Sequence, residues 1–242
     1  MKEAIVLASG LGKRLRTVTG DMPKVFYKFS GCELVKYPII SFMKRGVERF
    51  VLVVAKGHRE YGEKILRDLN VRGVVVENER VELGNAYSFF LSESYVESGR
   101  FFLSCGDSLF LPEALDGAFS DDDFHIKLGV SKDDSLVDTK EASKVLTDED
   151  GNIIKIGKKI QEYNYLDTGV FVMTEEAFRL KEHFSWTEEV SLYHVLQKAV
   201  DLGMIVRVFD FGNLPWTELD SPEDLNEEVY KLMERIREGI PC

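Results

Sequence analysis

The sequence predicts an α/β fold with a mostly parallel, doubly wound central sheet. In the first half, short apolar runs of strand length alternate with amphipathic stretches of helical spacing. Near-continuous apolar strands separated by helices are typical of a parallel sheet covered on both faces. The 242 residues are 44% hydrophobic and 30% charged, enough for one large core, so we expect a single domain over residues 1–242.

The elements follow in chain order. Strands in the first half are expected at Glu3–Ala8, Arg49–Val54, Val71–Glu77 and Phe101–Cys105, with helices at Pro38–Arg45, Arg59–Leu69 and Asn85–Glu93. The second half is richer in β structure, with strands expected at Phe124–Val130, Lys144–Thr147, Ile153–Ile156, Gly169–Met173 and Ile205–Asp210. Residues 148–152 contain glycine and predict a hairpin turn. Helices are expected at Thr174–Glu182 and Thr187–Leu202, and Ser221-Pro222-Glu223-Asp224 predicts the start of a final helix.

Composition excludes several classes of protein. The net charge of −11 argues against a nucleic-acid-binding surface. No run approaches the roughly 18 uncharged apolar residues of a membrane span, and the N-terminus does not look like a signal peptide, so a cytoplasmic protein that is not membrane-embedded is expected. Three cysteines (Cys32, Cys105, Cys242) and four histidines (His58, His125, His183, His194) are scattered, which predicts neither a disulfide framework nor a zinc site. Glutamine occurs only twice, while Lys, Arg and Glu are plentiful, which favours a thermophilic source.

A glycine loop follows the first strand directly. In Gly10-Leu11-Gly12-Lys13-Arg14 the glycines let the backbone approach a phosphate, and the two cations can neutralise its charge. A dinucleotide-binding loop needs a third glycine at position 15, which is Leu. A Walker loop needs glycine at position 7 and Ser or Thr after the lysine, and neither is present. A plain surface turn is the structural alternative.

Together with Pro23-Lys24, this loop resembles the G-x-G-x-R … P-K segment of the NTP-transferase superfamily, which includes sugar-phosphate nucleotidyltransferases and cytidylyltransferases. The resemblance implies the nucleotide-diphospho-sugar transferase-like fold. It also implies that the loop wraps a nucleoside triphosphate and that Arg14 and Lys24 stabilise charge during transfer. Ser9, where alanine is commoner, and Val25, where proline is common, depart from the pattern.

Two aspartates are candidates for a Mg²⁺ site, since Mg²⁺ accompanies nucleoside triphosphates and takes one or two protein carboxylates. Asp107 ends an apolar strand with Gly-Asp, at the sheet edge where ligands bind in open α/β sheets. Trp216–Leu225 resembles the W-x-D-V-D-T-P-E-D stretch of the superfamily, which implies that Asp220 shares the metal. Glu218 replaces a more usual aspartate, and its role stays open. Both aspartates also suit helix capping, which is the structural alternative.

The run Glu77–Ser88 bears on the nucleotide. Its Asn85-Ala86-Tyr87-Ser88 resembles the N-x-Y-S pattern of cytidylyltransferases, and an asparagine side chain can both donate to and accept from a pyrimidine edge. Asn85 is also a possible helix N-cap. The resemblance implies nucleotide contacts from Leu7, Ala8, Gly10, Gly12, Lys13, Asn78, Gly84 and Asn85.

Two segments bear on the acceptor. Ile156-Gly157-Lys158-Lys159-Ile160 and Asp167-Thr168-Gly169-Val170-Phe171 resemble CTP:inositol-1-phosphate cytidylyltransferases. That resemblance implies that Lys158 meets the acceptor phosphate and that Asp167 and Gly169 bind the acceptor. Lys158 fits a surface position on a hairpin strand equally well.

The expected reaction joins CTP and inositol 1-phosphate, with a separate membrane phosphotransferase using the CDP-inositol. Phosphocholine, a phosphonate or a sugar 1-phosphate as acceptor is the alternative. A non-catalytic nucleotide-sensing protein of the same fold is the second alternative.

Overall fold

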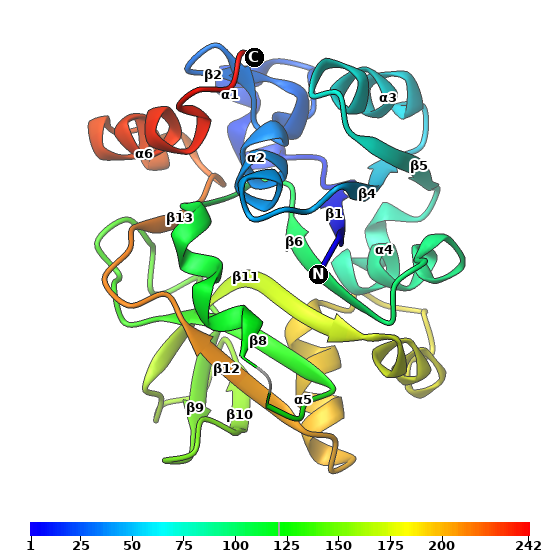
Figure 1. Cartoon of the computed structure of the whole chain (residues 1–242), viewed down its shortest axis with the longest axis vertical. Coiled ribbons are helices and arrows are strands. Elements are labelled where there is room, and N and C mark those ends of the chain that lie inside the picture. The colour runs from blue at the N-terminus through cyan, green and yellow to red at the C-terminus, as the bar shows by residue number, and fades with distance from the viewer. Residues whose placement is uncertain (121) are drawn as a thin grey trace.

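The structure is a computed structural model that describes residues 1–120 and 122–242. Within these residues, nine strands form one central sheet (Figure 1). Seven of them follow the order β10 (Ile153–Gly157), β9 (Lys144–Thr147), β11 (Tyr165–Thr174), β6 (Arg100–Cys105), β1 (Glu3–Ala8), β4 (Arg49–Ala55) and β5 (Arg72–Asn78). The other two, β8 (Ile126–Ser131) and β12 (Val206–Asp210), extend the sheet beside β11.

The first half of the chain builds the parallel part of the sheet. Strand β1 pairs in parallel with β4 and β6, and β4 pairs in parallel with β5. Successive residues of β1 point to opposite faces, so Ala4 and Val6 join one hydrophobic core while Ile5 and Leu7 join the other. All four expected strands of this half are present with ends shifted by no more than one residue, which confirms the prediction of a parallel, doubly covered sheet.

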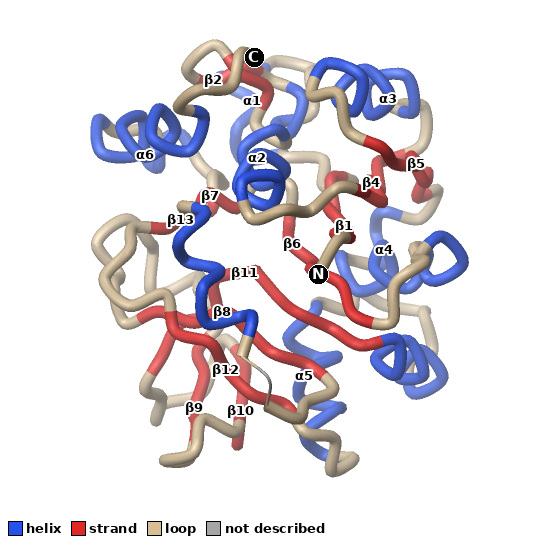
Figure 2. The backbone as a smooth tube through the Cα atoms, viewed as in Figure 1, coloured by secondary structure: helices blue, strands red, loops and turns tan. Residues whose placement is uncertain are grey.

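Helices cover both faces of this sheet. On the first face, α2 (Lys36–Lys44), α3 (Arg59–Asp68) and α6 (Glu227–Arg237) contribute apolar side chains to one core. On the second face, α4 (Asn85–Leu91) and α5 (Leu192–Asp201) contribute to the other. Figure 2 shows the strands running through the middle of the molecule with the helices arranged around them. This arrangement is the doubly wound architecture predicted from the sequence.

The second half adds an antiparallel region at one end of the molecule (Figure 1). Strands β9 and β10 form the predicted hairpin, and β11 runs antiparallel to β6, β8 and β9. The outer strands β10 and β12 approach one another, since Asn152 bridges to Arg207 and the Val208 N–H donates to the Gly151 carbonyl at 3.0 Å. The predicted β-rich elaboration is therefore confirmed.

Three helix predictions of the second half need correction. The segment expected at Thr174–Glu182 is a 3-10 helix, η6 (Glu175–His183), and α5 begins at Leu192 rather than at position 187. The final helix α6 begins at Glu227, with Asn226 as its N-cap, instead of at Ser221. Ser221 caps only the short turn η7 (Pro222–Asp224), because the Asp224 carboxylate turns back to accept the Ser221 N–H at 2.7 Å. Ser221 is therefore a cap, as predicted, but the turn that it caps does not continue into the final helix.

Several short elements could not be predicted from the sequence pattern, because two to four residues are too few to show a periodicity. They are the strands β2 (Lys28–Phe29), β3 (Cys32–Glu33), β7 (Ser108–Phe110) and β13 (Trp216–Glu218), the helix α1 (Arg16–Thr19), and the 3-10 turns η1 (Lys13–Leu15), η2 (Lys24–Phe26), η3 (Val81–Leu83) and η4 (Glu93–Tyr95). The longer 3-10 helix η5 (Pro112–Phe119) follows β7. Strand β13 pairs antiparallel with β7, and this small sheet positions the candidate site described below.

A disulfide joins Cys32 to Cys242, which overturns the prediction that the cysteines form none. The two residues are 210 positions apart, so their spacing says nothing about their distance in space. Helix α6 packs on α2, and α2 follows β3 directly, so the segment after α6 returns to Cys32. Cys105 is the free cysteine. The histidines do not cluster, and His125 and His194 accept backbone N–H groups through Nδ1.

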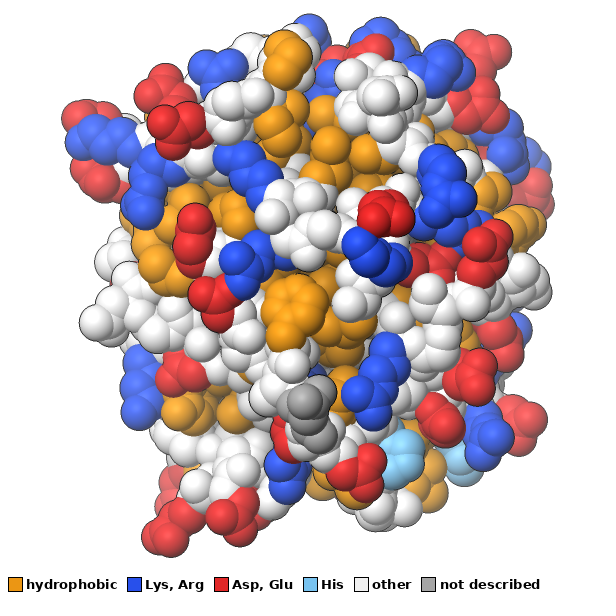
Figure 3. Space-filling view, in the orientation of Figure 1, with side chains coloured by type: hydrophobic (Ala, Val, Ile, Leu, Met, Phe, Trp, Pro, Cys, Tyr) orange, Lys and Arg blue, Asp and Glu red, His pale blue; other side chains and the backbone are white. Residues whose placement is uncertain are grey.

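Charged side chains of both signs are interspersed on the face shown in Figure 3, without a broad basic patch there. None of the helices in the described part of the chain combines the length and the apolar character needed to cross a membrane.

Candidate active site

The glycine loop lies at the carboxyl end of β1, where Gly12 makes room for Lys24. Gly12 has φ +57°, and a Cβ at this position would lie 2.7 Å from the Lys24 Cγ. Any larger residue would therefore be strained in its backbone and would also displace the lysine. Gly12 thus lets the loop lie directly over the Lys24 side chain, which brings the two halves of the motif together.

The two aspartates meet because β13 returns the chain to the end of β6. Asp107 follows β6 directly, and Asp220 follows β13, which pairs with β7 so that Glu218 lies opposite Ser108. The Leu219 N–H also donates to the Asp107 carbonyl at 3.2 Å. The backbone just after β13 is held by Asp224, whose carboxylate accepts the Asp220 N–H at 2.8 Å. A distant part of the sequence is thereby fixed beside the end of β6.

Lys24 lies between these aspartates. Its Nζ is 2.5 Å from Asp107 Oδ2 and 2.6 Å from Asp220 Oδ1, and it also donates to the Leu219 carbonyl at 2.7 Å. Burial alone would lower the pKa of the Lys24 ammonium, but the two carboxylates raise it above its usual value. Burial would raise the pKa of Asp220, whereas Lys24 and then Arg14, at 2.9 Å, lower it. The Lys24 ammonium and the Asp220 carboxylate are therefore charged together at neutral pH.

The asparagines predicted to bind the nucleotide differ in position. Asn78 is fully buried, and its amide donates to Ser88 Oγ at 2.9 Å, while Ser88 Oγ lies 2.7 Å from Ser9 Oγ. This buried chain of hydrogen bonds links the end of β5 and helix α4 to the start of the glycine loop. The hydroxyl of Ser9 takes part in it, which explains why a serine suits this position. Asn78 thus contacts the glycine loop through Ser88 and Ser9. Asn85 instead lines the pocket with its side chain.

Asn85 does not cap its own helix. Its Oδ1 accepts the Leu192 N–H at 2.9 Å, at the first residue of α5, and its Nδ2 lies 3.8 Å from Cys105 Sγ. The preceding Gly84 has φ +86°, and a Cβ there would lie 2.4 Å from the Val190 carbonyl oxygen. Gly84 therefore lets α4 begin against the segment that precedes α5, and Asn85 links the two helices at the pocket wall.

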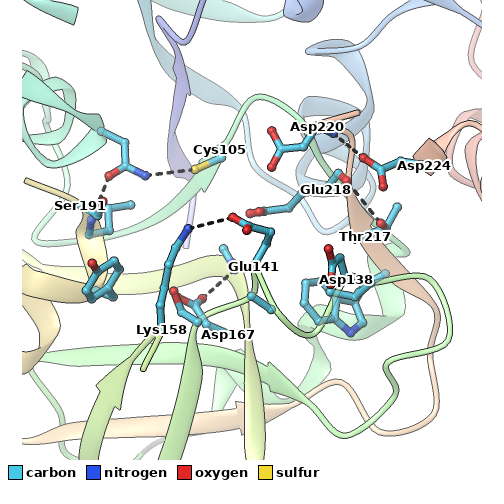
Figure 4. A pocket seen from close by; sticks show the side chains of 18 of the residues that line it. Cys105, Asp138, Glu141, Lys158, Asp167, Ser191, Thr217, Glu218, Asp220 and Asp224 are labelled. Atoms are coloured by element: carbon cyan, nitrogen blue, oxygen red, sulfur yellow. Dashed lines mark hydrogen bonds and ion pairs between the residues drawn. The ribbon is translucent and has the colours of Figure 1, made fainter. Parts of the chain in front are cut away.

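The predicted acceptor residues lie on the opposite side of the same pocket. Both Lys158 and Asp167 line the pocket, and Figure 4 shows the Lys158 side chain reaching toward Glu141. Burial raises the pKa of Asp167 to about 6, although the Gly169 N–H, which donates to its carboxylate at 2.8 Å, lowers it in part. Gly169 has φ +70°, and a Cβ there would lie 2.6 Å from Glu218 Oε1. One polar pocket thus brings together Arg14, Asn85, Lys158, Asp167, Gly169 and Asp220.

Comparison with known proteins places this chain in a family. The sequence profile described as nucleotidyl transferase matches residues 3–235, which is nearly the whole chain. The chain belongs to the nucleotidyl transferase family. The predicted fold type and superfamily are therefore confirmed.

Solved structures and curated relatives agree with this assignment. The inositol-1-phosphate CTP transferase from T. maritima matches with a TM-score of 0.99 and 71% identity, covering 100% of this chain and 98% of that one. HddC from Yersinia pseudotuberculosis shares the fold, with a TM-score of 0.75 at 20% identity over 97% and 99% of the two chains.

Two bifunctional IPC transferase and DIPP synthases are each 29% identical over 99% of this nucleotidyl transferase: that of Archaeoglobus fulgidus, of which the chain covers 45%, and that of Aquifex aeolicus, of which it covers 54%. The chain therefore spans about half the length of these relatives. The thermophilic bacteria among the relatives agree with the composition.

The acids of this nucleotidyl transferase suit a divalent cation. Asp107 and Asp220 face one position that already accommodates a positive charge, the Lys24 ammonium. Oxygen donors of this kind fit Mg²⁺. Ligand atoms of Glu218, Cys105 and Asp107 also lie within 4.8 Å of one another. Burial raises the pKa of Glu218 well above its usual range, and the nearby charges of Asp107, Asp220 and Asp167 raise it further.

Several pocket residues were not among the sequence candidates, and three of them carry ionisable groups close to the predicted ones. Cys105, Asp138 and Glu141 line the cavity. Cys105 lies two residues before Asp107 on β6, so the strand position could have indicated it; burial, then Asp107, Glu218 and Asp167, raise the pKa of its thiol. Asp138 and Glu141 belong to the loop between β8 and β9, which carries no motif, so no sequence signal marked them.

Proposed function

We propose that this nucleotidyl transferase makes CDP-inositol and pyrophosphate from CTP and inositol 1-phosphate, within a single domain formed by residues 1–242. The 71% identity with the T. maritima inositol-1-phosphate CTP transferase over the full length of the chain is the observation that carries the proposal. The pocket supports it: Lys158 offers a cation for the acceptor phosphate, and Asp167 offers a carboxylate for hydroxyl groups. The names of the bifunctional relatives point to the same cytidylyl transfer.

In this reaction a phosphate oxygen of inositol 1-phosphate attacks the α-phosphorus of CTP. The new O–P bond forms as the bond between the α-phosphorus and the bridging oxygen breaks, and the electron pair leaves with pyrophosphate. The acceptor needs no general base, because a phosphate monoester with a second pKa of about 6 is largely dianionic at neutral pH. The protein's part is to position the two substrates and to balance their charge.

The residues divide this work by place. The glycine loop with Lys13 and Arg14 faces the triphosphate, and Lys24 supplies a buried positive charge at the reacting end. Asp107 and Asp220 would hold Mg²⁺, which neutralises phosphate charge when it is bound. Asn85 lies where the cytosine edge would be read. Lys158, Asp167 and Gly169 lie on the acceptor side.

The decisive experiment measures pyrophosphate release with each of CTP, UTP, ATP, GTP and dTTP against a panel of acceptors. The panel contains inositol 1-phosphate, phosphocholine, a phosphonate and glucose 1-phosphate. We expect release with CTP and inositol 1-phosphate in the presence of Mg²⁺. Release only with UTP or dTTP and a hexose phosphate would overturn the proposed substrates, and no release with any pair would favour the non-catalytic sensor.

A cytoplasmic location and a membrane phosphotransferase that consumes the product complete the proposal. The relatives that combine IPC transferase and DIPP synthase in one chain support such a consumer, because they join cytidylyl transfer to a second synthetic step. Conversion of CDP-inositol by membranes of the source organism, with and without this protein, tests whether the two steps are linked.

A further inference from the structure

The loop at residues 132–143, which connects β8 and β9, forms one wall of the active-site pocket. It contributes Val137, Asp138, Glu141, Ala142 and Ser143 to the lining. Figure 4 shows Asp138 and Glu141 on the same side of the cavity as Asp167, with Glu218 across from them. The loop therefore lies where the acceptor enters, and the family motifs do not include it.

This loop is fixed to β13, the strand that leads to Asp220. Two side chains of β13 donate to its backbone: Trp216 Nε1 to the Asp133 carbonyl at 3.0 Å, and Thr217 Oγ1 to the Leu136 carbonyl at 2.6 Å. At its other end, the Ser143 carbonyl accepts the Asp167 N–H at 2.9 Å. These hydrogen bonds fix the position of the loop relative to the pocket. Residues that select a substrate need such support, because their side chains must be held in a defined geometry.

The three carboxylates on this side differ in the hydrogen bonds that they already accept. Asp138 Oδ1 accepts the Lys140 N–H at 2.9 Å, and Asp167 Oδ1 accepts the Gly169 N–H at 2.8 Å. Within residues 1–120 and 122–242, the Glu141 carboxylate accepts no hydrogen bond; its ion-pair partner is Lys158, at 3.8 Å. That distance is too long for a hydrogen bond, and both side chains are about half exposed, so the pair is loose.

We propose that Glu141 is a specificity-determining residue that selects polyhydroxylated phosphate acceptors. A dianionic acceptor phosphate competes with Glu141 for the Lys158 ammonium, because a phosphate offers more charge and more acceptor oxygens than a carboxylate. The released carboxylate then accepts hydrogen bonds from the hydroxyl groups next to the phosphate. An acceptor without hydroxyl groups gains the cation but offers Glu141 no donor. This inference rests on the proposed function and adds the residue that reads the polyol.

The test compares Glu141→Ala with the wild type on two acceptors, inositol 1-phosphate and ethyl phosphate, the latter followed as substrate or as competitive inhibitor. We expect kcat/KM for inositol 1-phosphate to fall about 10- to 100-fold, mainly through KM, since a hydrogen bond to a charged group is lost. The constant for ethyl phosphate should stay the same or improve, because Lys158 loses its competing carboxylate. Glu141→Gln, which keeps a neutral acceptor oxygen, should lie between Ala and wild type.

The matched control is Glu149→Ala, an exposed glutamate in the β9–β10 turn and outside the pocket lining. It should leave both constants unchanged. Equal losses for both acceptors in Glu141→Ala, or no loss for either, would overturn the inference while leaving the proposed function intact.

Wild-type inactivity on inositol 1-phosphate would instead remove the proposed function. The comparison is then made with whichever hydroxylated phosphate the wild type uses, and inactivity on every acceptor overturns both.

Discussion

Replacing Lys24 by methionine removes the positive charge that two acids share. The Lys24 side chain is 6% exposed, Asp107 17% and Asp220 36%, so the charges left behind are partly out of water. Removing one partner of a buried ion pair costs about 3–5 kcal/mol, and we expect about 3 kcal/mol here because the more exposed Asp220 is screened by solvent. For a chain of this size that corresponds to a fall in Tm of about 6–12 °C. Activity should fall by about 100-fold or more, since a preorganised charge at the reacting end is lost.

Magnesium makes this prediction specific to the site. A divalent cation supplies Lys24→Met with the charge that it lacks, so Mg²⁺ should raise its Tm more than that of the wild type. Calorimetry with and without Mg²⁺ measures both effects.

The control is Lys36→Met. That lysine is 1% exposed and contacts Glu33 at 2.9 Å and Asp68 at 3.0 Å, away from the pocket. It should lose similar stability without rescue by Mg²⁺, because Lys64 remains beside Asp68. Equal Mg²⁺ rescue of both variants, or a Lys24→Met variant as stable as the wild type, would refute the reasoning.

Three further outcomes are expected. Cys242→Ser removes the disulfide that closes a loop of 210 residues, and it should lower the free energy of unfolding by up to about 5 kcal/mol in a denaturant titration. Thiol titration of the denatured wild type should find Cys105 alone, and three free thiols would show that the disulfide is absent. Asp167 has its pKa raised from 3.8 to about 6, so the native chain keeps a proton that the unfolded chain releases, and stability should fall by up to about 1.4 kcal/mol per pH unit as pH rises from about 4 to 6. Asp167→Asn should lack this slope, and parallel stability curves would contradict the raised pKa. Asp107→Asn should abolish Mg²⁺-dependent turnover, and it should lower Tm less than Lys24→Met does, because Asp220 still pairs with Lys24 at 2.6 Å. Near-normal turnover would remove Asp107 from the metal site.

The sequence predicted the sheet well because its long strands carry a strong pattern. Strand β1 was predicted residue for residue, since Glu3 is followed by five consecutive apolar residues, a run typical of a strand buried on both faces. Strand β13 has three residues and no period, so its pairing with β7 could not be predicted. That pairing is what places Asp220 beside Asp107, and only family resemblance indicated that the two acids meet.

Other features of the site and the fold depend on contacts between residues far apart in the chain, which a sequence pattern does not reveal. The loop holding Glu141 has neither a motif nor a regular element, and its place is set by hydrogen bonds from Trp216 and Thr217. The Cys32–Cys242 bond likewise depends on where α6 packs. Asn78 was predicted at the nucleotide, and it stays a prediction; the side chain is buried and donates to Ser88, a contact that the linear sequence could not indicate.

The approach of β10 to β12 has a consequence for how this molecule behaves in a crowded solution. A strand at the edge of a sheet exposes backbone donors and acceptors that can recruit a second chain. In the described residues, the bond from the Val208 N–H to the Gly151 carbonyl lets two edges of the central sheet shield one another at their meeting point. The long edge then left is β5, which starts with exposed Arg72. A charge at the start of that strand opposes edge-to-edge pairing with a second chain, so both ends of the sheet carry a feature that disfavours aggregation.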